Sequence, residues 1–290
     1  MSGMTKHEFG GVWTRVKLSI LQDYVHFFTT ALRRKGFKLH YADAFAGTGT
    51  QSAKTKGGHD LLIPSEDFEG SVRVALGLKH PFDVYHFNDL SSEHVSELKR
   101  LASDYPEREV RVTQLDANDF VKDFCASLTH NDRAILFIDP YSTELEWETL
   151  HDVALSGRID LWMLFPLSAL LRMTPKGGVK PEWEEKLNKL LGTDQWIKEL
   201  YRPKPSPQIE DLFGAEVEDE TERLNVEGVS NYIRSRLMQQ FPYAAQPVTL
   251  YNNGHPLFLF CFAVSNNSKV AIALAEKVAR SILTKRNRLG

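Results

Sequence analysis

The stretch LHYADAFAGTGT, from Leu39 to Thr50, decides the fold of this chain. Its apolar start predicts a short strand, Asp43 stands at the end of that strand, and Gly47 and Gly49 follow in a turn. Glycine residues allow a backbone to turn sharply and to approach a bound molecule closely. We therefore expect a small ligand to lie against this turn, with Asp43 beside it.

Strands and helices alternate on both sides of this stretch. An amphipathic helix is expected before it, over Val12 to Gly36, and strands are expected after it at 83–89, 109–119, 133–141 and 159–166. A helix is expected in each interval, including one that Ser71 would cap and that would run to Lys79. Parallel strands need crossover connections, so this alternation predicts a doubly wound α/β sheet.

The remaining third of the chain adds two features to this sheet. From about 170 to 240, helical stretches surround a Pro-rich link and an acidic patch, which predicts a helical insertion suited to recognising a substrate or a partner. Two apolar strands then flank Asn252, Asn253 and Gly254, a strong signal for an antiparallel hairpin. A length of 290 residues fits one domain over 1–290 that includes this insertion.

Composition excludes several classes of protein. The net charge of −3 gives no overall basic field, so contact with nucleic acid would depend on local patches. Cys125 and Cys261 are the only cysteines and form neither a disulfide framework nor a metal cluster, which favours a reducing cytoplasm and no metal. No apolar run is long enough to span a bilayer, so we expect no membrane association.

Acids at the ends of successive predicted strands indicate what the ligand is. These acids are Asp43, Asp89, Asp116 and Asp139. The carboxyl ends of parallel strands meet in one crevice of such a sheet. S-adenosylmethionine offers a ribose diol, an exocyclic amine, an ammonium group and a sulfonium group to such carboxylates. The glycine turn lacks the Gly-Lys-Ser/Thr ending of a triphosphate loop and the late helix argues against NAD.

At these residues the chain resembles the class I S-adenosylmethionine-dependent methyltransferases. DAFAGTG looks like their first motif, HFND like the second and LDAND like the third, and the terminal hairpin looks like their antiparallel sixth and seventh strands. The resemblance implies a Rossmann-like fold in which Asp89 holds the ribose hydroxyls and Asp116 the adenine amine. It also implies cofactor contacts for the first motif, from Asp43, Phe45, Gly47 and Gly49.

More narrowly, the chain resembles the three-Cys-motif partner (TcmP) proteins, a bacterial and phage-associated family. The segments that carry this resemblance are WTRVKLSIL, YADAFAGTGT, EGSVRVAL, FIDPY and DLWMLFP, in that order. It implies a partner protein with a three-Cys motif. Lys17, within the first segment, is a candidate for the cofactor carboxylate, although a lysine on an amphipathic helix more often faces solvent.

The sequence FIDPYS is similar to the Asp-Pro-Pro-Tyr motif of methyltransferases that act on exocyclic amines of nucleic acid bases. Asp139 and the carbonyl of Pro140 would accept the two N–H bonds of the amine, and Tyr141 would stack on a flipped base. The second proline of the motif is missing, which shifts Tyr141 by one position. An Asp-Pro pair after a strand is also a common turn.

We therefore expect a methyltransferase whose acceptor is an amine of RNA or DNA. Three alternatives stay open: a protein or small-molecule acceptor, a catalytically silent subunit that binds a cofactor or a partner, and a different nucleotide cofactor. Basic residues that could flank the crevice are Lys54, Lys56, Lys176, Lys180, Lys186 and Lys189. Lysines interspersed with Glu182, Glu184 and Glu185 more often form a solvated helix face, which is the interpretation we favour. His40, His86 and the Trp162–Phe165 stretch are expected in the core, and Asp116 could simply cap a helix.

Overall fold

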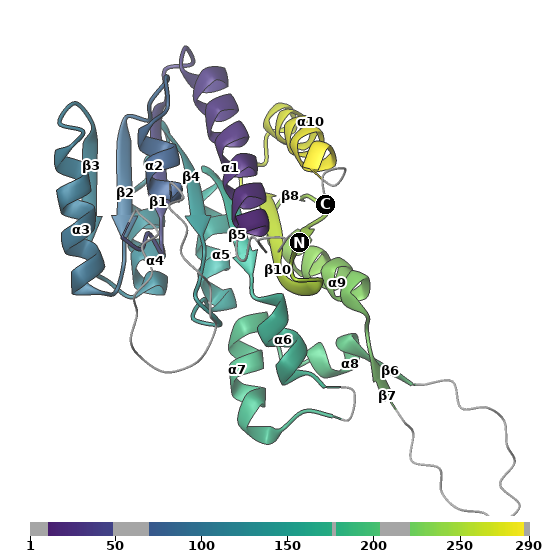
Figure 1. Cartoon of the computed structure of the whole chain (residues 1–290). Helices are drawn as coiled ribbons and strands as arrows, with labels where there is room; N and C mark the ends of the chain where they lie inside the picture. Colours follow the sequence, from purple (N-terminus) through teal and green to yellow (C-terminus); the bar gives the residue numbers. More distant parts are fainter. Residues whose placement is uncertain (1–10, 49–69, 176–177, 204–220, 287–290) are drawn as a thin grey trace, which may run out of the picture.

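A computed structural model describes residues 11–48, 70–175, 178–203 and 221–286, and Figure 1 shows the arrangement of its elements. The helices are α1 (Gly11–Leu32), α2 (Ser71–Leu76), α3 (Ser92–Ser103), α4 (Ala117–Ser127), α5 (Trp147–Ser156), α6 (Leu167–Met173), α7 (Pro181–Leu191), α8 (Trp196–Leu200), α9 (Val226–Met238) and α10 (Lys269–Arg286). The strands are β1 (Lys38–Asp43), β2 (Val84–Asn88), β3 (Glu109–Thr113), β4 (Asp132–Ile138), β5 (Ile159–Phe165), β6 (Tyr201–Pro203), β7 (Thr221–Arg223), β8 (Tyr243–Ala244), β9 (Val248–Asn252) and β10 (His255–Val264).

An eight-stranded sheet forms the centre of the molecule. Strands β3, β2, β1, β4 and β5 lie side by side in that order and run parallel. β10 then pairs with β5 in the antiparallel direction, and both β8 and β9 pair with β10. This strand order and this antiparallel hairpin are those of the Rossmann-like class I methyltransferase fold, so the predicted fold is confirmed.

The hairpin between β9 and β10 follows directly from its turn residues. Asn253 and Gly254 both have positive φ angles, of 50° and 78°. Two residues with positive φ form the type of turn whose twist matches that of antiparallel strands. The predicted hairpin therefore holds β10 in position beside β5, where it ends the parallel part of the sheet.

Helices cover both faces of the sheet (Figure 1). One face packs against α1, α2, α3 and α10, and the other packs against α4 and α5 together with buried side chains of α6 to α9. Trp162 on β5 is fully buried, and its ring lies 5.1 Å from that of Tyr24 on α1 and 4.6 Å from that of Phe262 on β10. The prediction that the Trp162–Phe165 stretch belongs to the core is thus confirmed.

The segment from 170 to 240 contains α7, α8, α9 and a short antiparallel ribbon of β6 and β7, which the sequence did not indicate. In Figure 1 this ribbon extends away from the sheet. Leu187, Leu191 and Trp196 of the segment are completely buried in the same core as β4 and β5. Most of the predicted Pro-rich link and acidic patch lies at 204–220, outside the described residues.

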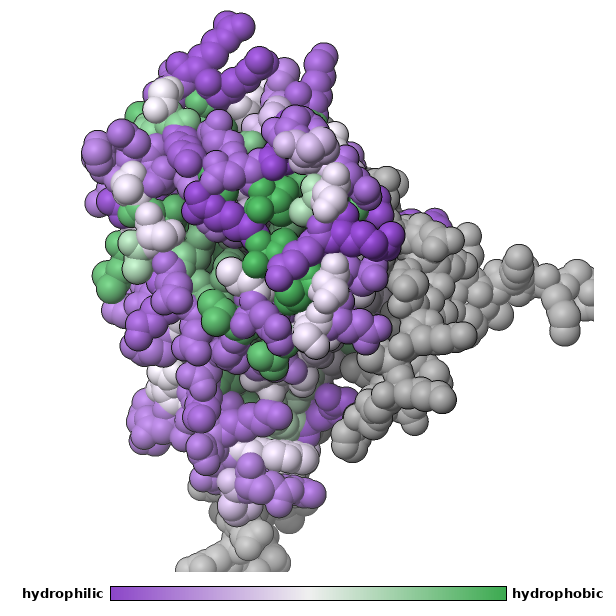
Figure 2. Space-filling view, turned by 90° about the vertical axis from the view of Figure 1, so that its left-hand side faces the viewer, coloured by the Kyte–Doolittle hydropathy of each residue, from purple (hydrophilic) through white to green (hydrophobic). Residues whose placement is uncertain are grey.

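Strand β3 forms one edge of the sheet, and Figure 2 shows the molecule from this side. Most of this face is hydrophilic, with smaller apolar areas between the polar side chains. On β3 itself, the Arg111 guanidinium donates to the Glu109 carboxylate at 2.5 Å, and both side chains are about half exposed. Charged side chains on an edge strand oppose pairing with other chains.

The two cysteines and the lengths of the helices bear on other possible roles of the chain. Cys125 on α4 and Cys261 on β10 are both free thiols, and burial raises the pKa of Cys125 to about 12. A thiol with so high a pKa is a poor nucleophile at neutral pH. Among the described helices, none combines the length and the apolar character needed to cross a membrane.

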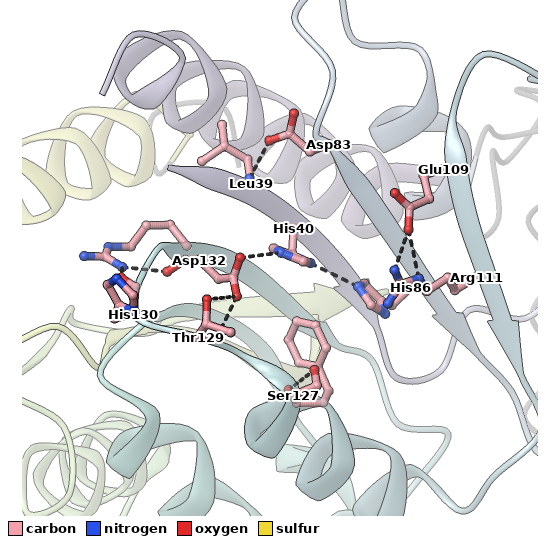
Figure 3. A network of polar contacts seen from close by, with 12 residues as sticks. Leu39, His40, Asp83, His86, Glu109, Arg111, Ser127, Thr129, His130 and Asp132 are labelled. Atoms are coloured by element: carbon pink, nitrogen blue, oxygen red, sulfur yellow. Dashed lines mark hydrogen bonds and ion pairs between the residues drawn. The ribbon is translucent and has the colours of Figure 1, made fainter. Parts of the chain in front are cut away.

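The two buried strand histidines belong to a polar network at the start of β4 (Figure 3). His40 Nδ1 lies 3.1 Å from His86 Nε2, and His40 Nε2 lies 3.1 Å from Asp132 Oδ1. The other oxygen of Asp132 accepts the Thr129 N–H and hydroxyl at 2.6 and 2.7 Å. Burial lowers the pKa of His86 to about 3, so it stays neutral. Both histidines are partnered core residues, as the sequence predicted.

Candidate functional site

The candidate site lies at the carboxyl ends of β1, β2 and β4. In the sheet β1 has β2 on one side and β4 on the other, so the order of the strands reverses beside β1. Ligands of doubly wound sheets bind in the crevice at such a reversal. The predicted site residue Asp43 is the last residue of β1, and Asp89 and Asp139 directly follow β2 and β4.

Asp43 is completely buried at the end of β1. One carboxylate oxygen accepts the Phe45 N–H at 3.2 Å, and the other accepts the Ser71 hydroxyl at 2.5 Å. Burial raises the pKa of Asp43 to about 7 and the charge of Asp139 adds to this, while the two hydrogen bonds and the charge of Lys17 oppose it. A carboxyl group with this pKa changes its charge when a cation approaches.

The turn after β1 is fixed by bonds from both sides. Gly47 has a φ of 60°, a conformation that glycine adopts without strain. Its N–H donates to Asp89 Oδ2 at 3.0 Å, and the Ala46 N–H donates to the carbonyl of Asn88 at 2.9 Å. A Cβ atom on Gly47 would lie 3.9 Å from the Tyr141 hydroxyl, so the ring of Tyr141 reaches over this turn. Gly49 lies outside the described residues.

Asp89 is 5% exposed and already holds three protein donors. Besides the Gly47 N–H, it accepts the Ser91 N–H at 2.8 Å and contacts His94 Nδ1 at 3.0 Å, both through Oδ1. The carboxylate thus joins the turn after β1 to the start of α3. One further acceptor position of Oδ2 is open to a ligand, and the ribose contact stays a prediction.

Asn88, which the sequence analysis did not single out, connects the ends of three strands. Its side-chain amide donates to the carbonyls of Ala44 and Leu115 at 3.2 and 3.0 Å. Its side-chain oxygen accepts the Thr113 hydroxyl at 2.9 Å and the Leu115 N–H at 3.0 Å. All of its hydrogen-bonding capacity is used inside the protein, which makes it a positioning residue. The motif HFND placed it next to the predicted acid, and that was the available signal.

The most informative contact of the site joins α1 to the end of β4. Lys17 Nζ lies 2.6 Å from Asp139 Oδ2, and the exposed fractions of the two side chains are 5% and 25%. The ammonium group also lies 5.2 Å from the Trp13 ring and 5.9 Å from the Phe137 ring, within cation–π range. Lys17 is therefore buried beside a predicted catalytic acid and does not face solvent. Its contact with a cofactor carboxylate stays a prediction.

Pro140 is buried directly after Asp139, whereas Tyr141 is 62% exposed. Partial burial of the Tyr141 hydroxyl and the nearby charges of Asp89 and Asp139 raise its pKa to about 12. The Tyr141 hydroxyl is therefore close enough to the strand-end acids to be affected by their charge. An exposed aromatic ring beside a carboxylate has room to stack on a planar group.

Asp116 is the predicted site residue with a clear local role. It caps α4, because its Oδ1 accepts the Asn118 N–H at 2.8 Å. The Asn118 side chain also binds the Glu144 carbonyl and the Thr149 hydroxyl, which ties α4 to the start of α5. The carboxylate of Asp116 is exposed, and its adenine contact stays a prediction.

The basic residues predicted to flank the crevice are only partly described. Lys54, Lys56 and Lys176 lie outside the described residues. On α7, Lys189 lies 3.8 Å from both Glu185 and Glu146. These side chains are largely exposed, which is the arrangement expected of a solvated helix face.

Comparison with known proteins gives similarity in structure only. The chain matches no protein-family model and no curated protein. The protein LPL1258 from Legionella pneumophila is 16% identical, over 66% of this chain and 77% of that one, with a TM-score of 0.43. Magnesium protoporphyrin IX methyltransferase from Synechocystis, crystallised with bound SAH, is 14% identical over 90% of each chain, with a TM-score of 0.40. An rRNA methylase from Streptococcus thermophilus is 11% identical, over 83% of this chain and 95% of that one, with a TM-score of 0.33.

Proposed function

We propose that this chain is an S-adenosylmethionine-dependent methyltransferase that acts on an amine. The observation that carries the proposal is the position of three strand-end acids, Asp43, Asp89 and Asp139, around one glycine turn at the reversal of strand order. Such a crevice suits a ligand that carries both a sulfonium and an ammonium group, because carboxylates favour nearby cations.

The residues present fit this cofactor. Gly47 turns the backbone beside Asp89 at a positive φ that favours glycine, and Asp43 is a buried carboxyl that loses its proton and becomes negatively charged when a cation binds. We assign Asp43, Phe45 and Gly47 to the cofactor, with Asp89 for its ribose and Asp116 for its adenine. The bound cofactor supplies an activated methyl group.

Asp139, Pro140 and Tyr141 would act on the acceptor. The Oδ1 atom of Asp139 and the carbonyl of Pro140 accept the two N–H bonds of the amine, which directs its lone pair toward the methyl group. The carboxylate of Asp139 then takes the proton that the nitrogen loses. Tyr141, exposed beside them, stacks on the ring that carries the amine. An exocyclic amine of an RNA or DNA base has this combination of a planar ring and a weakly nucleophilic nitrogen.

Two measurements test the proposal. Titration calorimetry should detect S-adenosylmethionine binding to the wild type, and Asp43→Ala should weaken it more than Asp139→Ala does. Transfer of a labelled methyl group to total RNA, DNA and protein then identifies the class of acceptor. Asp139→Ala should lower transfer by about 10²–10³-fold while cofactor binding persists. The absence of cofactor binding at millimolar concentration would refute the proposal.

A second candidate function is a catalytically silent, partner-binding subunit, and the Lys17–Asp139 contact favours it. The ammonium of Lys17 is itself an amine nitrogen held by the acid that would hold the acceptor. In this alternative, the segment from 170 to 240 is the recognition surface for a partner, such as a protein with a three-Cys motif. Lys17→Met separates the two functions. If Lys17 positions Asp139 for catalysis, the variant loses methyl transfer, whereas if Lys17 blocks Asp139, transfer appears or increases.

A further inference from the structure

A cavity of about 390 Å³ lies between α1 and α10, away from the site described above. In Figure 1 these two helices lie next to each other over the same part of the sheet. Apolar side chains of both helices form its walls, among them Phe27 and Phe28 on α1 and Leu274 on α10. Val270 and Leu274, which also line the cavity, are 78% and 42% exposed. The volume lies in the range of small-molecule sites.

Charged side chains also line this groove. They belong to Arg133, Arg158, Asp160 and the exposed Lys35. Arg133 and Asp160 are the second residues of β4 and β5. Because these are the amino ends of the parallel strands, the groove opens at the opposite end of the sheet from Asp43 and Asp139.

Within the described part of the chain, the two guanidinium groups retain unused donors. Arg133 stacks on the Phe37 ring at 4.0 Å and donates from Nη1 to the carbonyls of His130 and Asp132. Arg158 donates from Nη1 to the Ser156 carbonyl. Each guanidinium has five N–H bonds, so both can donate further. Both residues line the same cavity, and burial together with the charge of Arg158 lowers the pKa of Arg133.

The acid of the groove neutralises only part of this charge. Asp160 accepts the Tyr24 hydroxyl at 2.7 Å, and burial raises the pKa of Asp160 to about 7. Near neutral pH this carboxyl is therefore partly protonated. The residues that line the cavity include three cationic side chains, Lys35, Arg133 and Arg158, and one acid, Asp160, so the lining carries a net positive charge.

We propose that this groove binds a small amphipathic carboxylate, namely an alkyl carboxylate of medium chain length. The carboxylate accepts hydrogen bonds from Arg133 and Arg158, for which the fork of a guanidinium is well suited. The alkyl chain lies between α1 and α10, against Phe27, Phe28 and Leu274. A neutral apolar molecule would leave the two guanidinium groups without an anion, and a cation would be repelled by them.

Calorimetry with three ligands of equal chain length tests this proposal: decanoate, decanol and decyltrimethylammonium. The two charged ligands are used below their micelle concentrations and decanol below its solubility limit. Decanoate should bind more tightly than the other two. Arg158→Met keeps an apolar side chain of similar length and should weaken decanoate binding by about tenfold or more, as expected for a hydrogen bond to a charged group. Binding of decanol should not change. Arg280→Met, on the exposed side of α10, is the matched control and should leave decanoate binding intact.

A second variant tests the cavity itself. Ala271 lines the groove, and Ala271→Trp should abolish decanoate binding while the thermal midpoint stays within a few degrees of the wild type. Equal affinities for decanoate and decanol, no effect of Arg158→Met, or no binding of decanoate at all would each overturn the proposal. Binding of S-adenosylmethionine is measured on the same samples. Because the two sites lie at opposite ends of the sheet, either proposal can fail while the other holds.

Discussion

Replacing Asp43 by asparagine should change how the stability of the protein depends on pH. Asp43 is completely buried, and its pKa of about 7 lies above that of an aspartate in the unfolded chain. Between about pH 4 and pH 7 the folded state therefore holds a proton that the unfolded state has released. The stability contributed by this protonated group is complete below pH 4 and is lost as the pH rises through 7.

The size of the effect follows from this pKa. About two pH units separate pH 5 from the pKa of Asp43, and each unit is worth about 1.4 kcal/mol. From pH 5 to pH 8 the wild type should thus lose about 2–3 kcal/mol of unfolding free energy relative to Asp43→Asn. His86 also makes stability depend on pH. Its pKa is lowered to about 3, so its contribution makes the unfolding free energy rise between about pH 3 and 6.5. Because this contribution is the same in both proteins, it cancels when their unfolding free energies are subtracted.

Urea denaturation at about pH 5, 6, 7 and 8, followed by circular dichroism, measures this difference. Asp123→Asn, on the exposed side of α4, is the control for a change from acid to amide and should give a flat difference. A flat difference for Asp43→Asn as well would show that Asp43 is ionised throughout this range. The account of Asp43 as a carboxyl whose charge responds to a bound cation would then be wrong.

Two further substitutions test the packing of α7 against α5 and the hydrogen bonds among the strand ends. Gly192→Ala should destabilise the protein by about 2–4 kcal/mol, because a Cβ at its φ of 64° would overlap the Trp147 side chain. Gly157→Ala has the same strain at a φ of 63° but open space around it, so its thermal midpoint should fall much less; equal shifts would contradict the overlap. Asn88→Ala removes four hydrogen bonds among the strand ends and should lower the unfolding free energy by about 2–4 kcal/mol in urea titrations. The exposed Gln114, which bonds the Leu90 carbonyl, is its control, and a similar loss for Gln114→Ala would mean that burial of Asn88 contributes nothing.

Local patterns were sufficient to predict most of the sheet, although not its short strand β8. The strand from Lys38 to Asp43 and the hairpin turn at Asn253 and Gly254 lie where the sequence placed them, because their signals are apolar runs and turn residues close together in the chain. The strand expected over 109–119 ends earlier, at Thr113. The strand ends there because of a residue elsewhere in the chain. The backbone N–H and carbonyl of Leu115 form hydrogen bonds with the Asn88 side chain and not with a neighbouring strand.

Contacts between residues that are far apart in the sequence could not be predicted from such local patterns. Ser71 was expected to cap a helix running to Lys79, but Gly70 holds the cap position, the helix ends at Leu76, and the Ser71 hydroxyl binds Asp43 instead. Lys17 and Asp139 are 122 positions apart, and only the packing of α1 against the sheet brings them together. The acids of the candidate site could be proposed because each stands at the end of a predicted strand. The contacts through which Asn88 and His94 support Asp89 and its neighbours cannot be inferred from spacing in the sequence.

The two buried acids with a pKa of about 7 give a final prediction that links both ends of the sheet. Asp43 lies where we propose a cationic ligand, and Asp160 lies where we propose an anionic one. A cation lowers the pKa of a neighbouring carboxyl and an anion raises it. At pH 7, S-adenosylmethionine should therefore release a fraction of a proton from Asp43, and decanoate should cause Asp160 to take one up. Calorimetry in buffers of different ionisation enthalpy measures both changes, and Asp43→Asn and Asp160→Asn should each abolish the change at their own end only. If S-adenosylmethionine bound without a change in bound protons, Asp43 would not lie in its binding site. The same result for decanoate would exclude Asp160 from the groove that binds it.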